Sequence, residues 1–112
     1  MLEINYDAIA AAKTRILSGQ YNDPRQTDLR PLEPAFMADY IERNGWTNYS
    51  SWFLAIDTDE DETSVMRYRM PYGDLEFVSR AQLRHALEDA DRYGEFDIER
   101  AISDLIQVLD ED

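Results

Sequence analysis

The sequence predicts an α+β fold: two N-terminal helices, a three-stranded antiparallel β-meander and a C-terminal helical hairpin, in a single domain over residues 1–112. Three observations support it. Apolar residues recur at helical spacing at both ends of the chain. The middle holds short apolar or alternating runs separated by polar turns. A chain of 112 residues that is 44% hydrophobic is long enough to bury one core.

The first predicted helix covers residues 5–18, with Asn5 as its N-cap and Gly19 as its C-terminal stop. Its apolar face is expected to hold Ile9, Ala12, Ile16 and Leu17. Residues 20–33 contain two prolines and no periodicity, which is typical of an ordered loop.

The second predicted helix begins at Pro34, because proline is tolerated in a first helical turn. Asn44 and Gly45 are expected to end it. Its apolar face consists of Phe36, Met37, Tyr40 and Ile41. Trp46 and Tyr49 then fall in the connection to the sheet.

Three strands are predicted at residues 51–56, 64–70 and 75–79. The first is a compact apolar run, and we expect Trp52 in the core. The second alternates, with Met66, Tyr68 and Met70 on one face. The third is short, and we expect its Phe77 in the core. The turns between the strands are the acidic run 57–63 and the Pro-Tyr-Gly-Asp run 71–74.

The C-terminal hairpin is predicted from two amphipathic stretches. Ser79 caps the first of its helices and Gly94 ends it, while Asp97 caps the last. The apolar stripes are Leu83, Ala86, Leu87 and Ala90 on the first helix, and Ile98, Ala101, Ile102, Leu105, Ile106 and Leu109 on the second.

Charge is the strongest compositional signal. The chain has 24 acidic residues against 11 basic ones, for a net charge of −13. Small soluble domains usually carry a net charge of magnitude about 2–8. Direct binding to nucleic acid or to an anionic membrane is disfavoured, because phosphate contacts need Lys and Arg. A basic protein partner is favoured, and the alternative is a solvated acidic surface with no partner. No apolar run is long enough for a membrane span.

The sequence contains no motif that predicts an enzyme, a cofactor or a metal centre. Asp57, Asp59 and Asp61 match the first three ligand positions of a calcium loop. The match then fails, because Glu62 occupies the glycine position and Tyr68 the position of the bidentate glutamate. The single histidine, His85, is expected on a helix surface. A small enzyme with a pocket around His85 is the third and weakest hypothesis.

The acidic residues suggest a binding surface. Carboxylates on helices and hairpins lie roughly 5–7 Å apart, a spacing similar to that of phosphates along a DNA strand. Asp97, Asp104 and Glu111 repeat every seven residues along the last helix. Tyr72 is expected to be an exposed anchor. The predicted partner-binding residues are Asp57, Asp59, Glu60, Asp61, Glu62, Tyr72, Asp74, Glu76, Glu88, Asp89 and Asp91.

Residues 52–106 resemble a pattern in small proteins encoded by bacteriophages and prophages. The matching residues are Trp52-Phe53-Leu54 with Asp57, Arg67-Tyr68, Pro71-Tyr72-Gly73-Asp74, Val78-Ser79-Arg80, and Asp97-Ile98-Glu99 with Ala101. The resemblance implies a phage origin and transfers no catalytic residue.

By class and charge the chain is also similar to anti-CRISPR and anti-restriction proteins that act as DNA mimics. The first hypothesis is therefore a phage-encoded inhibitor in the cytoplasm of an infected bacterium, which blocks the basic nucleic-acid site of a host defence complex. The alternative is a phage accessory module that docks on another protein through an apolar patch around Tyr40, Trp46 and Tyr49.

Overall fold

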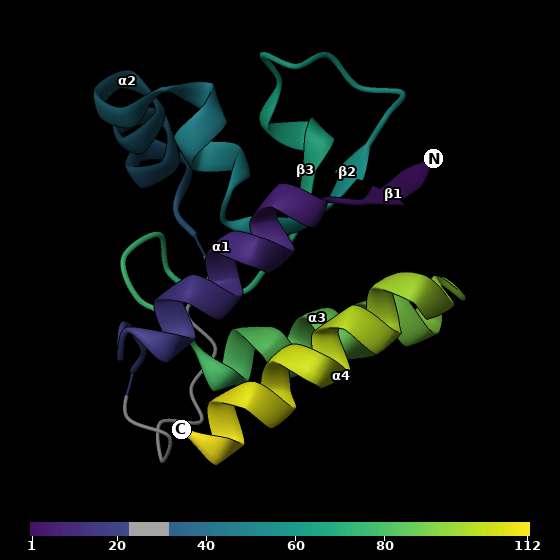
Figure 1. The fold of residues 1–112 in the computed structure, drawn as a ribbon. Helices are drawn as coiled ribbons and strands as arrows, with labels where there is room; N and C mark the ends of the chain where they lie inside the picture. The colour runs from purple at the N-terminus through teal and green to yellow at the C-terminus, as the bar shows by residue number, and fades with distance from the viewer. Residues whose placement is uncertain (23–31) are drawn as a thin grey trace.

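The computed structural model describes residues 1–22 and 32–112, so most of the predicted loop over 20–33 lies outside the described residues. The elements are β1 (Leu2–Ile4), α1 (Tyr6–Leu17), α2 (Pro34–Ser50), β2 (Phe53–Asp57), the 3₁₀ helix η1 (Val65–Arg67), β3 (Tyr68–Pro71), α3 (Arg80–Arg92) and α4 (Phe96–Glu111). Helices α3 and α4 lie side by side, and α1 runs between them and the sheet (Figure 1). The predicted α+β class is confirmed: the described residues form four α-helices and a three-stranded antiparallel sheet, with the helical hairpin α3–α4 at the C-terminal end.

The sheet has the order β1-β2-β3, with both pairs antiparallel. Leu2 pairs with Asp57 on one side of β2, and Ile56 pairs with Tyr68 on the other. The third strand is therefore Leu2–Ile4 and not residues 75–79, as the sequence suggested. Three residues at the start of the chain are too few to show a two-residue period.

Residues 75–79 form a loop in which a side chain satisfies two of the backbone donors. The Asp74 carboxylate accepts hydrogen bonds from the backbone N–H groups of Glu76 (3.0 Å) and Phe77 (2.7 Å). Leu75 has φ 71°, which lies outside the φ range of regular β-strands. The prediction that Phe77 belongs to the core is also wrong, because its side chain is 38% exposed. Met66 is exposed as well, since residues 65–67 form the 3₁₀ helix and the strand starts only at Tyr68.

The helix caps follow the sequence closely. The Asn5 side chain accepts from the N–H of Ala8, and Ser79 accepts from the N–H of Gln82, as predicted. Helix α4 instead begins at Phe96, so Asp97 lies within the first turn and is not its cap. An acid in the first turn still favours the helix, because it faces the positive end of the helix dipole.

Helix α2 contains a break where its end was predicted. Gly45 has φ 83° and ψ 166°, and a second short helical segment over 46–50 follows it. Trp46 and Tyr49 are thus helical residues, not part of an open connection.

The core lies between the sheet and the helices α1, α3 and α4. Trp52, at 2% exposure, is central to it as predicted. The Arg15 guanidinium stacks over its ring at 4.0 Å, and the Tyr72 ring stacks on it with centroids 5.0 Å apart.

Candidate functional site

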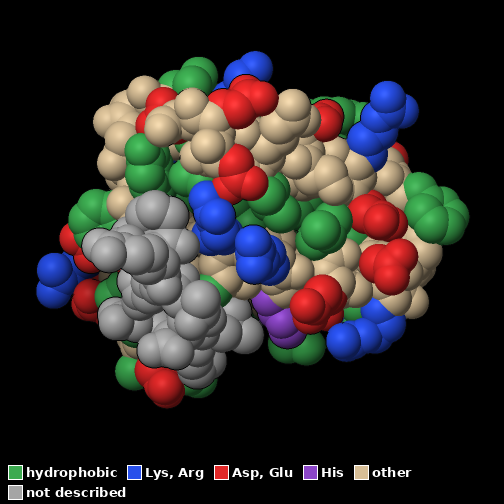
Figure 2. Space-filling view, turned by 90° about the horizontal axis from the view of Figure 1, so that it is seen from below, with side chains coloured by type: hydrophobic (Ala, Val, Ile, Leu, Met, Phe, Trp, Pro, Cys, Tyr) green, Lys and Arg blue, Asp and Glu red, His purple; other side chains and the backbone are tan. Residues whose placement is uncertain are grey.

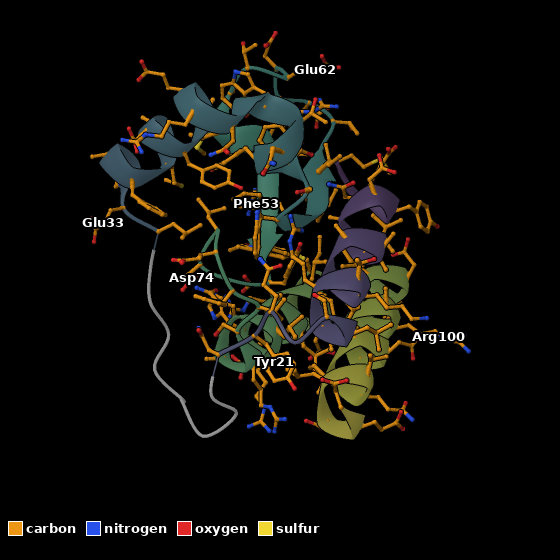
Figure 3. The ribbon with its side chains drawn as sticks, turned by 60° about the vertical axis from the view of Figure 1, so that its left-hand side comes forward. Tyr21, Glu33, Phe53, Glu62, Asp74 and Arg100 are labelled. Atoms are coloured by element: carbon orange, nitrogen blue, oxygen red, sulfur yellow. The ribbon has the colours of Figure 1, made fainter. Side chains whose placement is uncertain are left out.

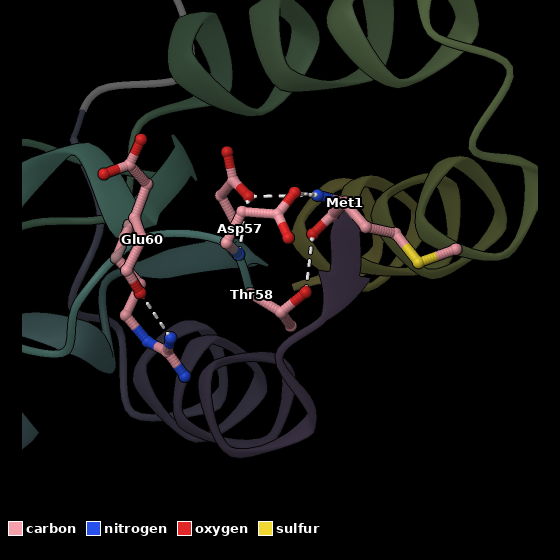
Figure 4. A network of polar contacts seen from close by, with 6 residues as sticks. Met1, Asp57, Thr58 and Glu60 are labelled. Atoms are coloured by element: carbon pink, nitrogen blue, oxygen red, sulfur yellow. Dashed lines mark hydrogen bonds and ion pairs between the residues drawn. The ribbon is translucent and has the colours of Figure 1, made fainter.

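The acidic loop, defined here as residues 57–62, joins β2 to η1 and is held by contacts to its backbone (Figure 4). Arg67 donates to the carbonyl oxygen of Glu60 (2.8 Å), and the Tyr68 hydroxyl donates to that of Glu62 (2.6 Å). The Met1 carbonyl accepts from both the N–H and the hydroxyl of Thr58. The loop therefore has a defined conformation while the side chains of Glu60 and Glu62 remain exposed.

Three of its aspartates make contacts within the chain. Asp57 accepts from the N–H of Asp59 and from the Met1 ammonium, both at 3.1 Å. Asp59 also pairs with the Met1 ammonium (2.5 Å), and Asp61 accepts from the N–H and hydroxyl of Thr63 (2.8 and 2.6 Å). These bonds favour the ionised carboxylate, so the pKa values of Asp57 and Asp61 lie below their usual range.

The second predicted group, Asp74 and Glu76, lies in the loop that follows β3. Since the acidic loop follows β2 and the strands are antiparallel, the two loops are at opposite ends of the hairpin. Figure 3 shows Glu62 and Asp74 on opposite sides of Phe53. The Asp74 carboxylate is an internal acceptor and is half-buried, whereas Glu76 is exposed.

The third predicted group lies in the second half of α3. Glu88 and Asp91 are exposed. Asp89 forms an ion pair with Arg92 (3.5 Å), and the Nε2 atom of His85 lies 3.5 Å from its other carboxylate oxygen. This group thus contains two exposed carboxylates and one that has a basic neighbour.

The structure contradicts the prediction that Tyr72 is an exposed anchor. Its side chain is fully buried, its hydroxyl donates to the Ser51 carbonyl (2.8 Å), and Arg15 donates to that hydroxyl. Burial raises the pKa of Tyr72 to about 12, although Arg15 opposes the shift. Tyr72 is therefore a core residue. The residues around it are typical of a turn, and for this reason the sequence suggested an exposed position.

The α4 row, defined here as Asp97, Asp104 and Glu111, is exposed along the helix, as expected. Glu111 accepts a hydrogen bond from Gln107 (3.2 Å), and nearby Asp110 pairs with Arg80 across the helical hairpin.

The negative charge is not spread evenly. The face in Figure 2 carries Lys and Arg side chains and the histidine, with apolar, Asp and Glu side chains among them. This face does not present a field of one sign.

The predicted apolar patch around Tyr40, Trp46 and Tyr49 does not exist in that form. Tyr49 is buried, and burial raises its pKa to about 12. Tyr40 and Trp46 are half-buried, and the Tyr40 hydroxyl accepts from the indole N–H of Trp52 (3.0 Å).

Trp46 instead separates two hollows that the sequence did not indicate. One is apolar, with a volume of about 300 Å³, and the other is polar, with a volume of about 550 Å³ and Asp7, Glu62 and Arg67 in its wall. No sequence signal points to the polar hollow, because residues far apart in the chain form its wall. The apolar hollow is formed mostly by α2, and it depends on the break at Gly45 and on the distant Val65.

His85 lies on an exposed part of α3, as predicted. Together with Gln82 and Asp89 it borders a hollow of about 340 Å³. Among the described residues that line this hollow, the only hydroxyl belongs to Tyr68, which already donates to Glu62. The described lining of this hollow therefore places no Ser or Thr hydroxyl beside His85.

Within residues 1–22 and 32–112, no group of three or more His, Asp or Glu side chains is arranged to hold a metal ion. In the same part of the chain, no helix is long and apolar enough to cross a membrane.

Comparison of the chain with protein-family models, with curated proteins and with solved structures finds no match.

Proposed function

We propose that this protein is a phage-encoded acidic inhibitor that occupies the basic nucleic-acid site of a bacterial defence complex as a DNA mimic. It would act in the cytoplasm of the infected host. The proposal begins from the net charge of −13, which favours a strongly basic partner and disfavours nucleic acid as a direct ligand.

The observation that carries the proposal is the fixed conformation of the acidic loop. Contacts from Arg67 and Tyr68 hold its backbone, so the carboxylates of Glu60 and Glu62 are presented without a large ordering cost. A partner that normally binds phosphates could form charge-assisted hydrogen bonds to these carboxylates. Long-range attraction would also accelerate capture.

The α4 row provides a second, regular set of charges. Seven residues of helix rise roughly 10.5 Å, which is close to three phosphate steps of about 3.4 Å each along one DNA strand. Asp97, Asp104 and Glu111 thus match every third phosphate in axial spacing. The acidic loop and the α4 row are alternative contact surfaces, and the experiment below separates them.

The test is competitive capture. The protein is immobilised, nuclease-treated bacterial lysate is passed over it, and bound proteins are eluted with duplex DNA or with a salt gradient. We expect a nucleic-acid-binding protein that elutes with DNA. A Glu60→Lys/Glu62→Lys variant should capture at least about tenfold less of it, because two charge-assisted contacts become repulsions.

The matched control is Asp104→Lys/Glu111→Lys, which changes the net charge equally on α4, and circular dichroism checks that both variants fold. If both variants capture less protein to the same extent, binding follows net charge. The acidic loop would then not be the specific contact. Captured proteins that resist salt and are not displaced by DNA would refute mimicry.

A further inference from the structure

The apolar hollow on α2, defined by its lining residues, lies apart from the acids that predicted the function. Those residues are Pro34, Met37, Ala38, Ile41, Trp46 and Val65. All six side chains are apolar, and Val65 is 40% exposed. Small-molecule sites start at about 300 Å³, so this volume accepts one or two apolar side chains of a partner.

The shape of the hollow depends on the break in α2. In an unbroken helix Trp46 would lie about 140° around the axis from Ile41, at 100° per residue. The Gly45 conformation redirects the chain, so that both side chains line the same hollow.

Contacts within the protein hold the side chains that line the hollow in place. Trp46 stacks on Tyr68 with centroids 5.8 Å apart and contacts the edge of Tyr49 at 5.9 Å. The Tyr49 hydroxyl donates to the Met37 sulfur (3.2 Å). Binding into a preformed hollow avoids much of the entropy cost of ordering side chains.

Negative charge adjoins the hollow. The polar hollow on the other side of Trp46 is lined by the carboxylates of Asp7 and Glu62. The cation among its described lining residues is Arg67, which already donates to the carbonyl of Glu60. After the hydrogen bonds from Thr63, Arg67 also contributes to the lowered pKa of the nearby Asp61. At the other end of α2, exposed Glu33 precedes Pro34 (Figure 3).

We infer that the apolar hollow and the adjoining acids bind a basic amphipathic helix of another protein. One apolar side chain of that helix enters the apolar hollow against Ile41 and Trp46. An Arg or Lys one turn away, about 5–6 Å along the same face, reaches Asp7 and Glu62. The described side chains that line the hollow are apolar apart from the indole N–H of Trp46, which favours a helix held by its charged flank over a small molecule held by several polar groups.

This inference does not depend on DNA mimicry, because it requires an apolar anchor in the hollow. Glu62 belongs to both proposed contact surfaces. Binding should therefore require both the apolar stripe and the positive flank of the partner. A partner that binds this protein as a mimic of nucleic acid would need only positive charge.

The experiment measures binding of synthetic peptides by the fluorescence of Trp46, since Trp52 is buried at 2% exposure. The probe is a peptide of about 18 residues, or roughly five helical turns, with Leu along one face and Arg on both flanks. Comparison peptides are a scrambled sequence of the same composition, and one in which Gln replaces every Leu. We expect a fluorescence shift with the amphipathic peptide and at least about tenfold weaker binding of the other two.

Val65→Asp places a charge at the rim of the hollow and should weaken binding of the amphipathic peptide by about tenfold. Leu17→Asp, at a site on α1 that is 60% exposed, is the matched control and should leave the affinity unchanged. Equal weakening by both substitutions would overturn the assignment of the hollow.

Two other results would also overturn the inference. If the peptide with Gln in place of Leu binds as tightly as the amphipathic one, charge alone acts, and the DNA-mimic proposal is left standing. If the protein self-associates by analytical ultracentrifugation and Val65→Asp abolishes this, the occupant is a second copy of the chain.

Discussion

At the scale of single residues, the most informative group is the stack of Arg15, Trp52 and Tyr72. Arg15 bridges the rings and the Ser51 hydroxyl, which its second guanidinium nitrogen approaches to 3.5 Å. The Tyr72 hydroxyl has a donor on one side and the Ser51 carbonyl on the other, so its polar atom is satisfied although the ring is fully buried. The stack joins α1 to the start of β2 and the end of β3.

This stack predicts an alkaline limit to stability. The pKa of Tyr72 is raised to about 12, against about 10 in an unfolded chain. A raised pKa in the folded state means that the stabilisation is complete below pH 10 and is lost as the pH rises toward 12. In urea titrations, the free energy of unfolding should fall over this window by up to about 1.4 kcal/mol per pH unit for this group.

The variant Tyr72→Phe tests the assignment. It removes the hydroxyl and leaves the Ser51 carbonyl without its donor, which should cost about 1–3 kcal/mol at neutral pH. The alkaline slope should become shallower, with Tyr49, whose pKa is also raised to about 12, still contributing. Tyr93→Phe, on an exposed tyrosine, should change neither quantity. An unchanged alkaline slope in Tyr72→Phe would refute the attribution.

At the scale of elements, the break in α2 at Gly45 has the largest structural effect. The pair φ 83° and ψ 166° belongs to a region that is essentially restricted to glycine. Space is not the constraint, because an added Cβ would meet no atom within 4 Å. The backbone conformation itself excludes other residues, and it positions Trp46 against Tyr68.

Gly45→Ala should therefore destabilise the protein by about 1–3 kcal/mol, or straighten α2 and remove Trp46 from the apolar hollow. Either outcome is visible as a changed denaturation midpoint or a changed Trp fluorescence. Gly45→Asn should be equally unfavourable. Gly94→Asn, at the end of α3 with φ 70°, is the comparison and should be tolerated, because Asn accepts left-handed helix ends. If Gly45→Ala is neutral by both measurements, the break does not depend on glycine.

At the scale of the whole molecule, the net charge dominates. The chain folds into a body of 36 × 31 × 23 Å that carries −13 charges. Within residues 1–22 and 32–112, a minority of the acids form ion pairs such as Arg80–Asp110 or Arg43–Asp39, and repulsion between the rest opposes compaction. Screening by salt or binding of a basic partner would reduce that repulsion.

Salt should therefore stabilise the protein. Raising NaCl from about 0.01 M to about 1 M shortens the Debye length from about 30 Å to about 3 Å, and Tm should rise by about 4–8 °C for each kcal/mol of repulsion removed. The triple variant Asp97→Asn/Asp104→Asn/Glu111→Gln should respond less, because it removes three exposed charges. Lys13→Gln, which adds one net negative charge, should respond more. Identical responses in all three proteins would show that self-repulsion is not the cause.

Much of the fold could be predicted from local sequence. Asn5 and Ser79 were identified as caps because short polar side chains satisfy the free N–H groups at a helix start. The apolar stripe of α4 predicted the buried side chains of Ile98, Ile102, Leu105 and Leu109. The third strand could not be predicted, since its pairing with β2 joins residues more than 50 positions apart.

The candidate sites also differ in whether local sequence or distant residues determine them. The acidic loop and the α4 row are properties of contiguous or periodic sequence, so their exposure was predictable. Tyr72 was placed wrongly because its burial arises from Arg15 and Trp52, both distant in sequence. The apolar hollow could not be predicted because it depends on the break in α2 at Gly45 and on the distant Val65.

The sequence alone therefore determined the fold class, the helix caps and the excess of negative charge, because each depends on residue type and short-range spacing. The tertiary structure decided which side chains are available to a partner. That outcome depends on long-range packing, which buried Tyr72, tied Asp74 into a loop and turned Trp46 into the wall between two hollows.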